Sequence, residues 1–157
     1  MYGSWVALLV MFWHEAVANN SIMLYSNKML DDMSSDDALL TPRQGTYLVG
    51  VANLLASGLS VFTARSFSRK SIFVYGHIAI GFFHMSIGYF AYKQNSLMAL
   101  ISMMCFVFAY QNSSGCITWL YCSEVAVDVV LGFVGTTGYL VVFILTLITN
   151  EMMEGPL

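Results

Sequence analysis

Charged residues are scarce in this sequence. Only 10% of its 157 residues are Asp, Glu, Lys or Arg, whereas 58% are hydrophobic. A soluble domain carries about 25% charged residues, so this chain cannot cover a folded core with a polar surface. Its formal net charge is −3 and no basic stripe runs along it, which argues against nucleic acid as a partner. We therefore expect an integral membrane protein.

Cysteine is also rare, and the spacings that bind metals are missing. The three cysteines, Cys105, Cys116 and Cys122, lie in or beside apolar runs without CxxC spacing, so we interpret them as small buried hydrophobic residues. The segment HEAVA lacks the second histidine of HExxH, and the aspartates of segment 27–45 lack EF-hand spacing. We expect no metal, no cofactor and no catalytic residue, and hence no enzyme.

Five apolar stretches have the length of a transmembrane helix, which is about 17–25 residues. The two prolines, Pro42 and Pro156, lie outside them, so proline breaks none of these stretches. The sequence predicts an all-α integral membrane fold in a single membrane domain, 1–157, whose longest connection, 27–45, is a solvated acidic loop. The five expected transmembrane helices span about 5–26, 46–63, 71–92, 97–122 and 129–149.

Polar residues interrupt two of the apolar stretches. His14 and Glu15 lie in the first, where an ionisable residue marks a functional site unless a partner neutralises it. The pair is therefore either a neutral structural contact or a proton-coupled or polar-solute site. In the fourth stretch, Gln111 to Gly115 (QNSSG) form a polar break. Such a break either lines a cavity or packs against a neighbouring helix.

Histidines and glycines recur at helical spacing in the third and fifth stretches. His77 and His84 share one helix face with Gly81 and Gly88, which favours a face turned toward protein and histidines that are neutral and hydrogen-bonded rather than a proton relay. The fifth stretch has a glycine at every third position: Gly132, Gly135 and Gly138. Small residues of this kind favour close helix packing. A role along a solute path is the alternative.

The fourth stretch ends in GCITWLYCSEV, which is similar to the pattern G-P-x-P-W-x-x-x-x-E. Gly115, Trp119 and Glu124 match that pattern, and Cys116 and Thr118 stand in place of its prolines.

The first stretch, HEAVANNSIMLYS, is similar to Q-Q-x-x-G-x-N-x-x-x-Y-Y-S. Asn20, Tyr25 and Ser26 match, whereas His14 and Glu15 replace the glutamine pair.

The second stretch has Asn53 at the polar position of a G-x-x-N helix, and the ARSFSRK that follows it is similar to D-R-x-G-R-R/K. Arg69 and Lys70 match this last pattern, with Arg65 in place of the acid and Ser68 in place of the glycine.

Together these segments identify a resemblance to the sugar porters of the major facilitator superfamily, over about residues 1–149. Their order matches helices seven to eleven, part of the carboxyl-terminal half of that fold, so we expect a chain without the amino-terminal half. The resemblance implies that a hexose would be held at the positions of His14, Glu15, Asn20, Asn53, Gln111 and Trp119. It also implies a gate-side charge network at Arg65, Arg69 and Glu124.

The departures from the family pattern shape the functional expectation. Arg65 replaces an acid, and Leu131 stands where an arginine is expected seven residues after Glu124. With one half of a transporter and altered charges, we expect a non-transporting accessory subunit of a larger membrane complex, in contact with other membrane subunits and lipids. The mitochondrial inner membrane, with its respiratory complexes, is the first candidate location. The alternative is half of a split or dimeric transporter of hexose or another small polar solute.

Overall fold

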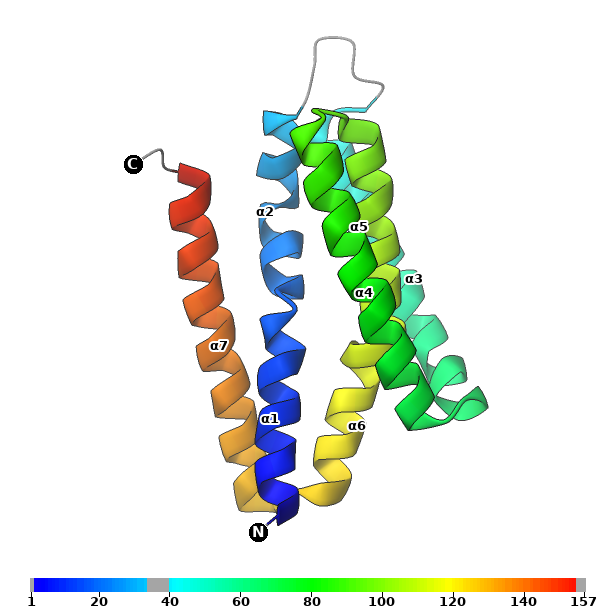
Figure 1. Ribbon diagram of the computed structural model, residues 1–157, viewed down its shortest axis with the longest axis vertical. Coiled ribbons are helices and arrows are strands. Elements are labelled where there is room, and N and C mark those ends of the chain that lie inside the picture. The colour runs from blue at the N-terminus through cyan, green and yellow to red at the C-terminus, as the bar shows by residue number, and fades with distance from the viewer. Residues whose placement is uncertain (1, 34–39, 155–157) are drawn as a thin grey trace. The chain divides into compact units, whose positions relative to one another are not determined.

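The computed structural model describes residues 2–33 and 40–154, and within these ranges the chain is helical and contains no strand (Figure 1). Part of the expected acidic loop, residues 34–39, lies outside the described residues. The helical elements are α1 (Tyr2–Ala16), α2 (Asn19–Asp32), α3 (Pro42–Ser66), α4 (Arg69–Tyr92), α5 (Ser96–Tyr110), the π-helical turn η1 (Gln111–Gly115), α6 (Cys116–Val125) and α7 (Asp128–Glu154).

Four helical runs are long and apolar enough to cross a membrane, which confirms the all-α membrane fold. They are Pro42–Ser66, Arg69–Tyr92, Ser96–Val125 and Val129–Met153. They contain the second to fifth expected spans, and each is longer than predicted. The polar break of the fourth span does not end the helix, because η1 joins α5 to α6 as a π-helical turn.

The first expected span, 5–26, is not one helix. α1 ends at Ala16 and α2 begins at Asn19, because Ala18 takes a left-handed conformation with φ of 58°. The N–H of Ala18 donates to the carbonyl of Glu15 at 2.9 Å and closes the turn. A left-handed residue with a Cβ atom costs about 1 kcal/mol, so the surrounding packing must hold this turn. α2 then continues to Asp32, through residues that were expected to belong to the loop.

Side-chain caps explain where three helices begin. At the start of α3, Thr41 accepts from the backbone N–H of Gln44 at 3.3 Å, and the Gln44 side chain accepts from the N–H of Thr41 at 3.0 Å. This capping box precedes Pro42, whose fixed φ suits the first helical position. Ser68 and Asn95 cap α4 and α5 in the same way, each accepting from a backbone N–H three residues on.

The described residues form two compact units, which are considered one at a time. Unit one contains Met1–Ser21 and Thr118–Leu157, and unit two contains Ile22–Ile117. The single membrane domain expected over the whole chain stays a prediction.

In unit one, α7 packs along α1. The fully buried hydrophobic side chains are Ala7 and Met11 of α1, Cys122 of α6 and Val134 of α7. A Cβ atom built on Gly138 would lie 3.1 Å from the sulfur of Met11, so this glycine does permit the close approach expected of it. A Cβ atom built on Gly132 or on Gly135 would have no described atom of a neighbouring segment within 4 Å. The predicted glycine packing is therefore found at one position of three.

In unit two, α5 is the most buried helix, and α3 and α4 pack against it and against η1 (Figure 1). Phe106 of α5 is fully buried, and the His84 ring of α4 meets it edge-on at 4.5 Å between centroids. Gly81 and Gly88 are exposed and no described atom lies within 4 Å of an added Cβ, so the prediction that their face is turned toward protein stays a prediction. The glycine of α4 that does face a neighbouring segment is Gly76, which lies against Ser113 of η1.

Candidate functional site

Two amide side chains meet between helices in unit two. Asn53 projects from α3 and Gln111 is the first residue of η1, and both are half-buried. The Nε2 of Gln111 donates a hydrogen bond of 2.5 Å to Oδ1 of Asn53. The structure thus brings together two of the residues that the resemblance assigns to solute binding.

The π-helical turn explains how Gln111 reaches this position. A π-turn inserts an extra residue into a helix and is frequent at functional sites. Gly115, at the end of the turn, leaves the space that the Gln111 side chain uses, because a Cβ atom on Gly115 would lie 2.5 Å from Oε1 of Gln111. The polar break of the sequence therefore positions the Gln111 carboxamide within a membrane-length helix.

The next two residues of η1 have different neighbours. Asn112 accepts a hydrogen bond of 2.9 Å from the hydroxyl of Thr63. Thr63 lies on α3, like Asn53, but closer to the end of that helix. Ser113 is buried, donates to the carbonyl of Ala109 within its own helix at 2.6 Å, and faces Gly76 of α4. The packing alternative for the polar break is found, because Ser113 packs against α4 while Gln111 and Asn112 pair with polar groups of α3. Its role in lining a cavity stays a prediction. The sequence reasoning missed the Thr63–Asn112 contact.

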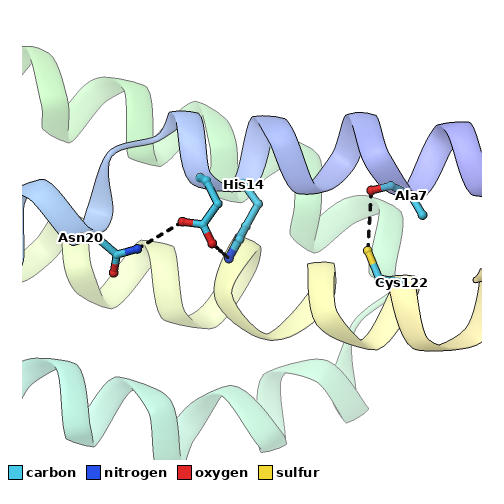
Figure 2. A network of polar contacts seen from close by, with 5 residues as sticks. Ala7, His14, Asn20 and Cys122 are labelled. Atoms are coloured by element: carbon cyan, nitrogen blue, oxygen red, sulfur yellow. Dashed lines mark hydrogen bonds and ion pairs between the residues drawn. The ribbon is translucent and has the colours of Figure 1, made fainter. Parts of the chain in front are cut away.

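In unit one, three polar residues gather at the junction of α1 and α2 (Figure 2). The Oε2 of Glu15 accepts a hydrogen bond of 3.1 Å from Nδ2 of Asn20, and its Oε1 lies 3.7 Å from Nε2 of His14. The His14 side chain is 4% exposed and that of Glu15 is 12% exposed. His14, Glu15 and Asn20 thus form a contiguous cluster.

Other polar residues of unit one lie on α6 and at the start of α2. Trp119 of α6 is 43% exposed. Its neighbour Thr118, which stands in place of a family proline, is fully buried, and its hydroxyl oxygen has no hydrogen-bond partner among the described residues. The side-chain oxygen of Asn19 is likewise buried without a hydrogen-bond partner among the described residues. Buried oxygens of this kind are usually paired with protein or water.

The expected site residues are divided between the two units. His14, Glu15, Asn20 and Trp119 belong to unit one, whereas Asn53 and Gln111 belong to unit two. Their convergence on one solute stays a prediction.

The same division separates the gate-side charges. Arg65 and Arg69 are exposed at the ends of α3 and α4 in unit two, and Glu124 is exposed on α6 in unit one. The gate-side charge network expected at Arg65, Arg69 and Glu124 therefore stays a prediction. In the described part of the chain, no three His, Cys, Asp or Glu side chains are grouped so that they could hold a metal ion.

Membrane-length helices in the described part of the chain, two of which are joined by a carboxamide pair, define a polytopic membrane protein. Residues 4–155 match the sugar (and other) transporter family, so the chain belongs to that family. It is 28% identical over 131 residues to the D-xylose-proton symporter of Escherichia coli K12, and equally so to that of Escherichia coli O157:H7. The alignments cover 81% of this chain and 26% of each relative, so the chain spans about a quarter of their length. No solved structure matches the chain significantly.

Proposed function

We propose that the chain supplies one wall of the solute path of a sugar-type membrane transporter, and that the Asn53–Gln111 pair binds the solute. The hydrogen bond between these two amides is the observation that carries the proposal. A carboxamide offers two N–H donors and a carbonyl acceptor. After the mutual bond, Asn53 keeps its amino group and Gln111 keeps its carbonyl oxygen, a donor and an acceptor side by side. Sugar hydroxyls need such a combination, because each both donates and accepts.

The family and its relatives support a small polar solute. The two relatives are named for D-xylose and a proton, so D-xylose is the first probe to use. The chain belongs to a family of transporters, and we propose that it contains no catalytic site. Its half-buried amide pair is suited to reversible binding of an uncharged hydroxyl compound.

Binding of labelled D-xylose to the full chain in lipid nanodiscs tests the proposal. We expect Asn53→Ala and Gln111→Ala each to weaken binding about tenfold, since one hydrogen bond to a neutral partner contributes about 1 kcal/mol and the partner amide also loses its positioning contact. Asn27→Ala is the matched control, because Asn27 is an exposed amide near the middle of α2, and its affinity should equal that of the wild type. Wild-type binding that both amide variants retain in full would refute this role of the pair.

A second candidate function is the accessory subunit expected from the altered charges. Arg65 in place of an acid and Leu131 in place of an arginine favour a chain that does not undergo the switching motion of its family. Under this proposal the chain is held by other membrane subunits and lipids, with the mitochondrial inner membrane as its location. Purification of the tagged full chain in mild detergent distinguishes the candidates. A fixed stoichiometry with a large complex, together with no D-xylose binding, would favour the accessory role.

A further inference from the structure

We propose that the turn between α3 and α4 binds the headgroup of an anionic phospholipid through the side chains of Arg65 and Lys70. This lipid site lies at one end of unit two and does not depend on the proposed solute site. Three features of unit two support it. They are a group of exposed cations, the place of these cations between two membrane-length helices, and the contrast with the cations at the other end of the same unit.

The connection between α3 and α4 is short and brings two cations to the same end of unit two. Only Phe67 and Ser68 separate the two helices. The N–H of Phe67 donates to the carbonyl of Thr63 at 3.2 Å and closes the last turn of α3, while Ser68 caps α4. Arg65 lies in that last turn of α3 and Lys70 in the first turn of α4, so the two side chains flank one tight turn.

The positive charges of this turn are not balanced within unit two. All residues from 65 to 71 are exposed. In the described part of this unit, no residue forms a hydrogen bond or an ion pair with the side chain of Arg65 or Lys70. Arg69 adds a third positive charge but has an interaction within the chain, so Arg65 and Lys70 are the residues assigned to the headgroup. The pattern D-R-x-G-R-R/K has an acid at the position of Arg65, whereas segment 65–71 contains none.

The cations at the start of α4 are unfavourable for the helix itself. The N-terminus of a helix carries a partial positive charge, so acidic residues stabilise the first turn and basic residues destabilise it. The first turn of α4 begins with Arg69 and Lys70 and contains no acid. A bound anion would offset the charge of the side chains and that of the helix end together. A departure from a local rule of this kind is expected where a function compensates for it.

The position of the turn indicates that the anion comes from a lipid. Both α3 and α4 are long and apolar enough to cross a membrane, so the turn that joins them lies at the depth of the lipid headgroups. Phe67, between the two cations, is 65% exposed, and aromatic side chains are enriched at this interface. Basic side chains at a membrane surface attract anionic lipids, and arginine binds phosphate through two parallel N–H donors.

The opposite end of unit two also has three cations, but these have partners or acids close by (Figure 1). The Nε of Arg43 donates to the hydroxyl of Tyr47 at 2.9 Å, and its guanidinium lies 5.7 Å from the centre of the Tyr47 ring. The Nζ of Lys93 lies 6.0 Å from the centre of the Tyr92 ring. Lys28 is followed within one turn of α2 by two aspartates. The two ends therefore differ in how much positive charge is available to a lipid.

Native mass spectrometry tests the lipid site by counting the lipids that the full chain retains from nanodiscs with equal amounts of phosphatidylglycerol and phosphatidylcholine. We expect the wild type to retain the anionic phosphatidylglycerol in preference. Arg65→Gln and Lys70→Gln should each lower this preference about fivefold, the effect of one basic side chain at a membrane surface. Arg65→Asp, which introduces the acid of the pattern, should abolish it. Arg43→Gln and Lys93→Gln are the matched controls and should change the preference less than about twofold.

Two further measurements on the wild type complete the test. The preference for phosphatidylglycerol should weaken as the salt concentration rises, because salt screens exposed charges. Excess inorganic phosphate should leave the lipid in place, and its displacement by phosphate would show that the ligand is a soluble anion. Equal losses in the variants of the two ends would show a general attraction to charge and overturn the site. A wild type that retains both lipids equally, or whose preference does not change with salt, overturns it as well.

Discussion

Replacing Gly76 with alanine is expected to destabilise unit two by about 1–3 kcal/mol, the range found when a packed interior is overfilled. A Cβ atom at this position would overlap Cβ and Oγ of Ser113, one of the buried residues of η1. The backbone of α4 or of the π-turn must move to relieve this overlap. Reversible unfolding of the chain in lipid, followed by circular dichroism of its helices, measures the loss.

Two glycines of the same helix provide matched controls for Gly76. At Gly81 and Gly88 no described atom lies within 4 Å of an added Cβ, and alanine is the better helix former. We expect alanine at either position to leave the free energy of unfolding unchanged or to raise it slightly. Gly76→Ala combined with Ser113→Gly should recover most of the loss, because the second change removes both overlapping atoms. If Gly76→Ala is as stable as Gly81→Ala, the close approach of α4 to η1 is wrong.

The second to fifth expected helices could be predicted from the sequence because they depend on composition. Apolar runs of membrane length report burial in lipid directly, and capping residues such as Thr41 and Ser68 mark where helices begin. The faces of those helices could not be predicted in the same way. His77, Gly81, His84 and Gly88 share one stripe, yet it is Gly76, outside that stripe, that contacts η1.

The turn between α1 and α2 shows a second limit of the sequence. Neither proline nor glycine occurs at residues 17 and 18, so the apolar run 5–26 reads as one helix. The family pattern Q-Q-x-x-G has its glycine at the position of Ala18, which is the residue with positive φ. That alignment is a signal that would have located the turn, because glycine adopts such a conformation without strain.

The candidate site could be predicted in part. The partners Asn53 and Gln111 follow from the resemblance, as do His14, Glu15 and Asn20. The helix end at which the last three residues meet was not predicted. The contact of Thr63 with Asn112 does not, because threonine near the end of an apolar stretch is common and its partner lies 49 residues away in sequence. Contacts of this length depend on the tertiary packing of α3 against η1.

Truncation of Phe106 to alanine is expected to cost about 3 kcal/mol, the lower part of the range for buried aromatic residues. Phe106 is fully buried in unit two, with its ring edge-on to His84 at 4.5 Å and stacked on Tyr110 at 6.3 Å between centroids. Because the unfolded reference state in a bilayer is already apolar, the loss comes from the cavity and the missing ring contacts rather than from transfer to water.

Phe82 of α4 is the matched control for that truncation, since its side chain is 65% exposed. On a membrane-spanning helix an exposed ring faces lipid, and lipid refills the space that its removal leaves. We expect Phe82→Ala to change the free energy of unfolding by less than about 1 kcal/mol, the usual size for a substitution away from the core. Equal losses for the two variants, measured by the same unfolding experiment, would show that α5 is not the buried centre of unit two. A large loss confined to Phe106 supports α5 as the buried centre of unit two. The same packing positions η1, because Phe106 stacks on Tyr110 and Tyr110 immediately precedes Gln111 of the amide pair.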